Sequence, residues 1–258
     1  MPDDLSDIPR GNVLGVAVSA IDMPMALGCI ENWIRVRDPH YVCVTPAHAV
    51  MECVDHPELK AVYNHSGLTT PDGMAIVWLM RWQGYRQVER VYGPDLLLAV
   101  CAAAEEAGYR NYFYGGAPEV TPRLVEALTR RFPHLQIAGY ESPPFGALSR
   151  EEEAAAEERI RQAKPDIVWV GLGSPRQEVW MSQEVARVDV PVLVGVGAAF
   201  DFLSGAKPQA PRWVQRSGLE WLFRFFSEPG RLWKRYIKYP RFVVLALMQH
   251  FGVRDFPV

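Results

Sequence analysis

The sequence predicts an α/β protein with a doubly wound, mostly parallel sheet, helices on both faces, and a basic, aromatic, helical appendage at the C-terminus. Three observations lead to this prediction. Short apolar strand cores alternate with helical patterns at roughly 25-residue spacing, which is typical of βαβ units. The strand cores are continuously apolar, as expected for strands covered on both faces. After Asp201 the pattern changes to helices rich in arginine and aromatic residues.

The first 92 residues are expected to contain two strand regions and several short helices. The β-branched stretch Val13–Ile21 predicts a strand or a hairpin, and Tyr41–Val44 predicts a short buried strand. Proline can open a helix at its first position, which favours helices beginning at Pro24 and Pro57. Further helices are expected around residues 50–54 and from Met74 to about Trp82, after a turn at residues 68–73.

The alternation is clearest in the middle of the chain. Strands are expected at residues 111–114, 136–140, 167–170 and 192–197, and helices at 96–107, 118–132, 150–163 and 174–187. Gly108 is a natural stop for the first of these helices. Ser149 and Glu152 form a capping-box pattern at the start of the third.

Composition limits the class of protein. The chain has 258 residues, of which 49% are hydrophobic and 22% charged, as in a globular protein with a sizeable core. The four cysteines form no CxxC pair, which favours a reducing compartment. The N-terminus is acidic and polar rather than signal-like, and no run reaches the ~18 apolar residues of a spanning helix. We expect a cytoplasmic protein, one that can still contact membranes.

Charge divides the chain unevenly. Residues 206–258 hold ten Lys or Arg and three acidic residues, whereas residues 1–205 hold seventeen basic and twenty-seven acidic residues. We therefore expect a core at 1–205 and a helical appendage at 206–258 that meets an anionic partner. Arginine and aromatic residues suit an anionic membrane surface. They also suit a homo-oligomer interface, whereas helices this apolar argue against nucleic acid.

Small-residue turns follow several of the expected strands. They include Gly115-Gly116, Gly171-Leu172-Gly173 and Gly197-Ala198. In a doubly wound sheet such turns lie at the ligand-binding edge and let backbone N–H groups approach a phosphate, although glycine also serves tight packing alone. A nucleotide diphosphate is a natural ligand. GxGxxG and Walker A patterns are absent, and without HExxH or Asp-x-Asp no metal or other cofactor is expected.

Two polar positions have two interpretations each. Asp72, in Thr70-Pro71-Asp72-Gly73, either caps the following helix or acts as a general base aimed by its rigid neighbours. Likewise, Ser174 and Gln177 form a capping box, or Arg176 and Gln177 face the ligand and bond sugar or phosphate. Local sequence favours capping for Asp72, and position slightly favours function for Arg176 and Gln177.

An ordered series of motifs over nearly the whole chain resembles the WecG/TagA/CpsF family of glycosyltransferases (glycosyltransferase family 26). The motifs are Thr45-Pro46, Thr70-Pro71-Asp72-Gly73, Arg90-Val91-Tyr92-Gly93-Pro94-Asp95-Leu96, Tyr114-Gly115-Gly116, Val170-Gly171-Leu172-Gly173-Ser174-Pro175-Arg176-Gln177-Glu178, Phe200-Asp201-Phe202-Leu203-Ser204-Gly205, Ala210-Pro211-Arg212-Trp213, Gly218-Leu219-Glu220-Trp221-Leu222-Phe223-Arg224 and Glu228-Pro229-Gly230-Arg231.

The resemblance implies an inverting, metal-independent transfer of a sugar from a UDP-sugar to a polyprenyl-diphosphate-linked sugar in teichoic acid, common antigen or exopolysaccharide synthesis. It implies Asp72 as the base. The substrate-binding residues that we carry over or select beside it are Thr45, Gly73, Arg90, Asp95, Gly115, Gly116, Arg176, Gln177, Arg212, Arg224 and Arg231. The last three belong to the appendage and would hold the lipid diphosphate. The resemblance thus implies a catalytic core that binds a nucleotide sugar at 1–205, an appendage that binds membrane and acceptor at 206–258, and peripheral association with the inner face of the plasma membrane.

One position departs from the family pattern. The asparagine that commonly follows Thr-Pro is Ala47 here. Either His48 compensates for the missing amide, or the donor differs from the N-acetylmannosamine type. Two alternatives lie outside catalysis: a UDP-sugar-binding regulatory subunit, and a membrane scaffold for such a pathway.

Overall fold

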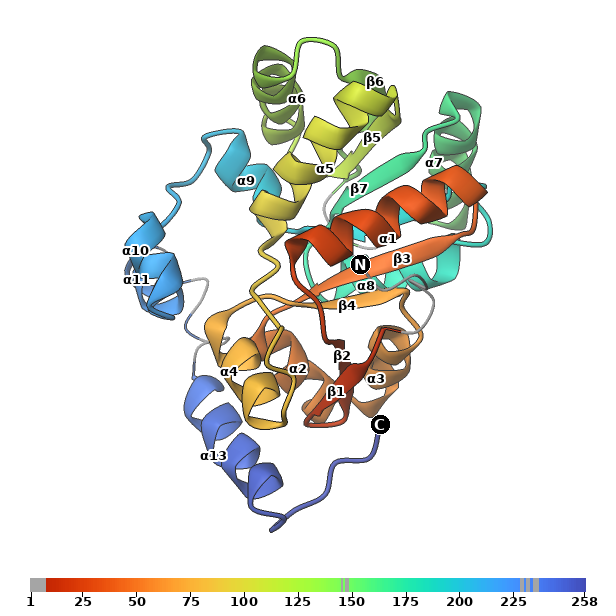
Figure 1. Ribbon diagram of the computed structural model, residues 1–258. Coiled ribbons are helices and arrows are strands. Elements are labelled where there is room, and N and C mark those ends of the chain that lie inside the picture. The colour runs from red at the N-terminus through yellow and green to blue at the C-terminus, as the bar shows by residue number, and fades with distance from the viewer. Residues whose placement is uncertain (1–7, 145, 147–148, 228–229, 231–232, 234–236) are drawn as a thin grey trace. The chain divides into compact units, whose positions relative to one another are not determined.

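Strands and helices alternate along most of the chain in this computed structural model, which describes residues 8–144, 146, 149–227, 230, 233 and 237–258 (Figure 1). The strands are β1 (Arg10–Val13), β2 (Val16–Ser19), β3 (His40–Thr45), β4 (Leu68–Pro71), β5 (Arg110–Gly115), β6 (Gln136–Glu141), β7 (Ile167–Gly171) and β8 (Val192–Gly195). The helices before residue 110 are α1 (Met23–Val36), α2 (Ala47–Asp55), α3 (Pro57–Asn64), α4 (Met74–Trp82) and α5 (Gly93–Ala107). The later ones are α6 (Val120–Arg131), α7 (Arg150–Ala163), α8 (Arg176–Glu184), α9 (Ala199–Leu203), α10 (Arg212–Arg216), α11 (Glu220–Ser227) and α13 (Tyr239–His250).

The predicted α/β class is confirmed. Six strands form a sheet in the order β4-β3-β8-β7-β5-β6. The pairings of β3 with β8, β8 with β7, β7 with β5 and β5 with β6 are all parallel. The central strands β7 and β8 are buried on both faces, as the absence of polar alternation predicts, whereas the edge strand β6 is partly exposed.

The contacts of the chain fall into two groups. The hairpin unit comprises the described residues of 1–26, 44–92 and 208–258, and the sheet unit comprises residues 27–43 and 93–207. The C-terminal residues therefore group with the segment that carries Asp72. The expected functional division at residue 205 remains a prediction, because grouping by contact does not test what each part does.

In the hairpin unit, β1 and β2 form an antiparallel ribbon, which confirms the expected hairpin. Leu14 and Gly15 both have positive φ angles (52° and 90°), as a two-residue turn of the type I′ kind requires. The ribbon also anchors the end of the chain. Asn12 donates a hydrogen bond to the Phe256 carbonyl (2.7 Å), and Gln249 donates one to the Asn12 carbonyl (3.1 Å).

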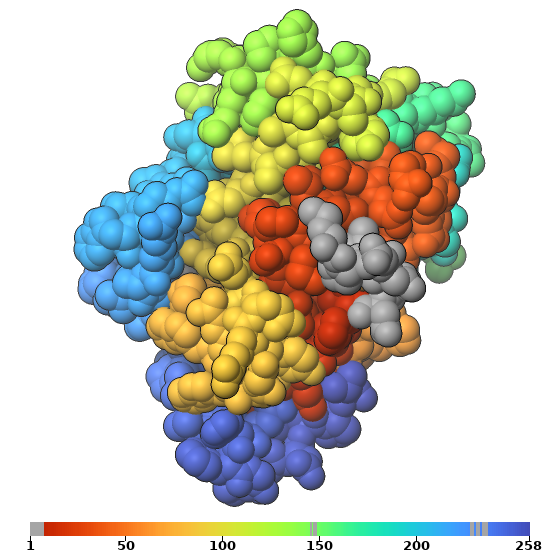
Figure 2. Space-filling view, in the orientation of Figure 1, coloured from red at the N-terminus to blue at the C-terminus, as the bar shows by residue number. Residues whose placement is uncertain are grey.

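Helix α13 lies on the same unit. It buries Phe242, Leu245 and Ala246. Lys238 forms ion pairs with Glu52 and Asp55 at 2.9 Å each, and Arg241 also pairs with Asp55. The rings of Trp82 on α4 and His250 on α13 are 5.3 Å apart, and the two helices adjoin at the molecular surface (Figure 2). Within the described residues, no helix is both long and apolar enough to cross a membrane.

In the sheet unit, one buried polar pair joins two neighbouring strands. Trp169 on β7 is fully buried and donates from Nε1 to Asn111 Oδ1 on β5 (2.9 Å). The predicted capping box of α7 is confirmed, because Ser149 and Glu152 each bond the backbone N–H of the other.

One expectation about local structure is wrong: residues 68–71, predicted as part of a turn, form the buried strand β4.

Candidate active site

Asp72 lies between strand β4 and helix α4 in the hairpin unit. Its backbone N–H donates to the Thr45 carbonyl at the end of β3 (3.2 Å). Gly73 follows with a φ of 113° and is the N-cap residue of α4, where no side chain bonds the helix end. The interpretation of Asp72 as a helix cap is therefore wrong, because its carboxylate turns to a cation elsewhere in the chain.

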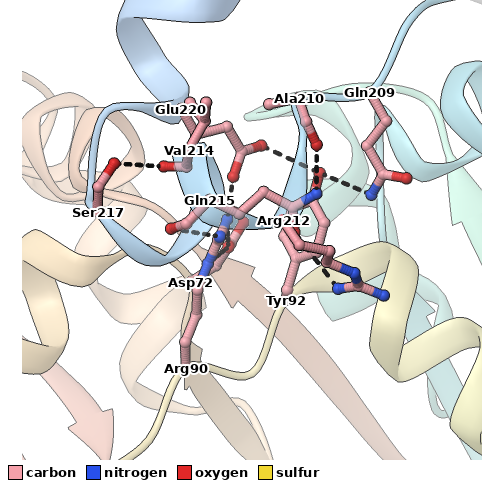
Figure 3. A network of polar contacts seen from close by, with 10 residues as sticks. All are labelled: Asp72, Arg90, Tyr92, Gln209, Ala210, Arg212, Val214, Gln215, Ser217 and Glu220. Carbon is pink, nitrogen blue, oxygen red and sulfur yellow. Dashed lines mark hydrogen bonds and ion pairs between the residues drawn. The ribbon is translucent and has the colours of Figure 1, made fainter.

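That cation is Arg90 (Figure 3). Arg90 donates from Nε (3.3 Å) and from Nη2 (3.1 Å) to the same oxygen, Oδ1 of Asp72. Its Nη2 also donates to Glu220 Oε2 at 2.6 Å, and its Nη1 donates to the Gln215 carbonyl at 3.4 Å. One guanidinium thus joins the loop after β4 to the C-terminal helices α10 and α11.

Tyr92 and Gln209 extend this network (Figure 3). The Tyr92 hydroxyl donates to Glu220 Oε1 (3.0 Å) and accepts from Gln209 Nε2 (3.3 Å). The Arg90 guanidinium carbon lies 4.1 Å from the centre of the Tyr92 ring, a cation–π distance. Arg90 is therefore held by two carboxylates, a backbone carbonyl and an aromatic face.

Burial and the two nearby arginines shift the pKa of Asp72 in opposite directions. Burial raises the pKa of Asp72, and the charge of Glu220 raises it further, whereas Arg90 and Arg224 lower it. The net direction is upward. Burial alone would lower the pKa of Arg90, but the two carboxylates raise it, so Arg90 stays charged. A carboxylate with a raised pKa is a stronger base than an ordinary aspartate.

The two oxygens of Asp72 differ in their surroundings. Oδ1 accepts both hydrogen bonds from Arg90, whereas no hydrogen bond reaches Oδ2 from the described residues. The side chain is 16% exposed. One oxygen is fixed and the other can accept a proton from a bound molecule, which is the geometry that a general base needs.

In the sheet unit, the glycine turn after β5 has a packing role. A Cβ atom on Gly115 would lie 2.5 Å from the Gly171 backbone, and one on Gly116 would lie 2.5 Å from Thr121 Oγ1. Both residues have positive φ angles. The tight-packing explanation therefore holds for these two glycines, whatever they bind.

Gly173 differs, because its φ is 82° and nothing lies within 4 Å of the position of a Cβ. Its backbone is open to close approach by a ligand.

Gln177 does not form the capping box that its position suggests. Pro175 is the N-cap residue of α8 and makes no side-chain cap. Instead Gln177, which is 3% exposed, accepts from the Gly173 N–H (3.2 Å) and donates to Glu178 Oε1 (2.9 Å). Both ends of its amide are used within the sheet unit, so Gln177 holds the turn at Gly173. Arg176, in the first turn of the same helix, is half-buried.

The remaining predicted residues lie in one unit or the other. Thr45, at the end of β3 in the hairpin unit, is fully buried, while Asp95 is half-buried in the first turn of α5 in the sheet unit. Arg212 is exposed and Arg224 is half-buried near Asp72. Arg231 lies outside the described residues. The hairpin unit thus brings Asp72, Gly73, Thr45, Arg90 and Arg224 into one region, and the sheet unit holds Asp95, Gly115, Gly116, Arg176 and Gln177.

Four of the residues described around Arg90 were not selected from the sequence: Tyr92, Gln209, Gln215 and Glu220. Two of them, Tyr92 and Glu220, lie inside motifs that the sequence does show. Their pairing joins positions 128 residues apart, so no local spacing pattern could have found it. Among the residues that the structure describes, no cluster of three or more His, Cys, Asp or Glu side chains is arranged to hold a metal ion.

The chain matches known proteins over most of its length. The model of the glycosyl transferase WecG/TagA/CpsF family matches residues 11–255. Two relatives carry the name N-acetylglucosaminyldiphosphoundecaprenol N-acetyl-beta-D-mannosaminyltransferase. One, from Bacillus spizizenii (strain ATCC 23059 / NRRL B-14472 / W23), is 32% identical over 77% of this chain and 75% of its own length. The other, from Bacillus subtilis (strain 168), is 29% identical over 91% and 93%.

Proposed function

The chain belongs to the WecG/TagA/CpsF family and is a glycosyltransferase of cell-surface polysaccharide synthesis, and from this premise we propose its donor, acceptor and mechanism. The donor is a UDP-sugar, and the acceptor is N-acetylglucosamine carried on a polyprenyl diphosphate. The relatives' names support the acceptor. The transfer inverts the configuration at the anomeric carbon and needs no metal ion.

The observation that carries this mechanism is the asymmetry of Asp72. With Oδ1 fixed by Arg90, Oδ2 takes the proton of the acceptor hydroxyl as that oxygen attacks the anomeric carbon. The bond from the anomeric carbon to UDP breaks on the opposite face, which inverts the centre. UDP leaves with its negative charge stabilised by backbone N–H groups and arginines. The appendage residues Arg212, Arg224 and Arg231 are the candidates for the arginine contacts.

A membrane surface supplies the lipid-linked acceptor in this proposal. The appendage exposes large apolar side chains, which suits peripheral attachment to the inner face of the plasma membrane. Val243, Val244 and Leu247 on α13 are 52%, 55% and 38% exposed, followed by Phe251 at 72%. The exposed Arg254, three residues beyond Phe251, would meet lipid phosphates.

Ala47 determines which donor should be tested first. It is the first residue of α2, directly after Thr45-Pro46, and it is buried. An alanine has no amide with which to hold an acetamido group. We therefore expect a donor other than UDP-N-acetylmannosamine, or a supporting contact from His48, which is half-buried in the same helical turn.

The experiment is a donor panel with a synthetic polyprenyl-diphosphate-linked N-acetylglucosamine and the full-length protein. UDP release and the glycosylated lipid are both measured, with and without EDTA. One UDP-sugar should give acceptor-dependent product that EDTA does not suppress. Ala47→Asn should shift preference toward UDP-N-acetylmannosamine. Absence of acceptor-dependent product with every UDP-sugar would overturn the proposed donor class, and loss of product with EDTA would overturn metal independence.

A further inference from the structure

Glu220 is a buried carboxylate that the mechanism above does not use. Glu220 is 8% exposed. One of its carboxylate oxygens accepts a hydrogen bond from Arg90 Nη2 at 2.6 Å, and the other accepts one from the Tyr92 hydroxyl at 3.0 Å. Burying a charge is unfavourable unless it is paired and hydrogen-bonded. The pairing explains how Glu220 is tolerated, but a buried apolar residue at this position would avoid the penalty altogether.

The effect of Glu220 is visible in how Arg90 meets Asp72. A guanidinium beside a single carboxylate commonly bonds both oxygens side by side. Here Arg90 Nη2 is shared between Asp72 and Glu220, and Nη1 is directed to the Gln215 carbonyl. The Tyr92 ring lies against the guanidinium and limits its rotation. Arg90 consequently reaches Oδ1 of Asp72 alone.

We propose that Glu220 is a positioning residue for the base: by drawing Arg90 and Tyr92 toward itself, its carboxylate holds Arg90 on one oxygen of Asp72 and leaves the other oxygen free for the acceptor hydroxyl. This inference rests on the proposed role of Asp72. It also assigns to α11 a role other than binding lipid, because the C-terminal segment completes the base only while Glu220 lies against Arg90.

Charge supports the same role. The ionisable groups that face Asp72 are Arg90 and Tyr92 from the segment before α5, and Glu220 and Arg224 from α11. Glu220 raises the pKa of Asp72 and the two arginines lower it. If Glu220 loses its charge, both cations act on Asp72 without this opposition. Asp72 then becomes a weaker base with a lower pKa.

The test is Glu220→Gln. This variant preserves the volume of the side chain, but its one amide oxygen can replace only one of the two carboxylate oxygens that accept hydrogen bonds. With the UDP-sugar that is active in the donor panel, kcat should fall about tenfold or more, a part of the usual effect of an acid–base group. The acid limb of the pH–rate profile should move to lower pH, while KM for the donor stays unchanged. Tyr92→Phe, which removes one of the two hydrogen bonds, should move the limb in the same direction by less.

Asp55→Asn is the matched control. Asp55 is also a carboxylate of the hairpin unit that pairs with cations of the C-terminal segment, Lys238 and Arg241, but it makes no described contact with Asp72. Its acid limb should stay in place. If Glu220→Gln keeps the wild-type limb and kcat, or loses activity only in proportion to folded protein, the positioning role is wrong.

A second measurement is independent of turnover. The protonated-carboxyl infrared band that Asp72→Asn removes gives the titration of Asp72 directly. Comparing that band in the wild type and in Glu220→Gln should give a lower midpoint in the variant. An unchanged midpoint overturns the positioning role even if no donor is found, whereas an active Asp72→Asn enzyme overturns the proposed base instead.

Discussion

The two units of the molecule differ in where they place charge and apolar surface. Of the fifteen large hydrophobic side chains that are exposed among the described residues, thirteen belong to the hairpin unit and two, Val36 and Tyr140, to the sheet unit. The hairpin unit also buries a charged network around Arg90. The sheet unit instead buries several large aromatic residues, including Trp169, Tyr114 and Phe113.

This difference indicates a division of tasks. The hairpin unit keeps features that are unfavourable for stability, an apolar surface in water and a partly desolvated carboxylate, and such features are typical of functional regions. The sheet unit has the closely packed glycine turns of a scaffold. The difference also revises the meaning of the basic appendage, because Lys238 and Arg241 pair with acids of α2. Part of its positive charge serves the fold rather than an anionic partner.

The largest expected effect is that of Asp72→Asn. Turnover should fall roughly 10²–10⁴-fold, the usual contribution of a positioned acid–base group. Since the pKa of Asp72 is raised in the folded protein, its charged form lowers native stability at pH values above that pKa. The variant should therefore unfold at the same or a higher temperature than the wild type at pH 7, and this advantage should vanish in acid. Near-wild-type turnover of Asp72→Asn would contradict the assignment of the general base to the hairpin unit.

The next effect concerns the sheet unit as a scaffold. Gly115→Ala should lower the free energy of unfolding by about 2–5 kcal/mol, because it adds a clash with the Gly171 backbone to the strain of a positive φ. The matched variant Gly173→Ala, where a Cβ meets nothing, should lower it by about 1–2 kcal/mol. Urea denaturation measures both losses of stability.

UDP titration calorimetry should show weakened binding in Gly173→Ala, and unchanged affinity would exclude close approach of the phosphate at this turn.

A smaller effect is expected at the membrane. Val244→Glu places a charge on the exposed face of α13 and should weaken binding to vesicles of anionic phospholipid about tenfold, with no change in thermal unfolding. Tyr140→Glu, at a similarly exposed position (49%) of the sheet unit, is the control and should bind like the wild type. Equal losses in the two variants would contradict a membrane role specific to the hairpin unit. Vesicle flotation at fixed ionic strength separates these outcomes.

The smallest effect is a pH dependence within the sheet unit. Burial, followed by the neighbouring carboxylate of Glu157, raises the pKa of Glu184 to about 7. A raised carboxyl pKa means that the folded state favours the protonated form of Glu184. The stability that this form contributes is lost as pH rises through about 7. Glu184→Gln should raise the Tm at pH 8 by about 2–4 °C, equivalent to about 1 kcal/mol. At pH 5 the two proteins should unfold together, and a constant difference at both pH values would contradict the shift.

Most of the fold could be predicted from the sequence because its signals are local. Apolar strand cores, proline starts and glycine stops act within a few residues, and the parallel sheet follows from their alternation. The capping box at Ser149 and Glu152 was predicted correctly for the same reason, since its two partners are three residues apart. The family, too, could be recognised from short ordered motifs, and the match over residues 11–255 confirms it.

The partners of Asp72 could not be predicted in this way. Its cation is 18 residues away, and that cation's second carboxylate is 130 residues further along the chain. The local rule favoured a helix cap, but a guanidinium brought in by folding competes better for a buried carboxylate than a backbone N–H does. Gln177 failed as a cap for a similar reason, since Glu178 and the Gly173 N–H occupy its amide. The sequence therefore identifies Asp72 as the candidate base, while its ion pair with Arg90, the oxygen that Arg90 leaves open and the proposed dependence on Glu220 arise from contacts that exist only in the folded chain.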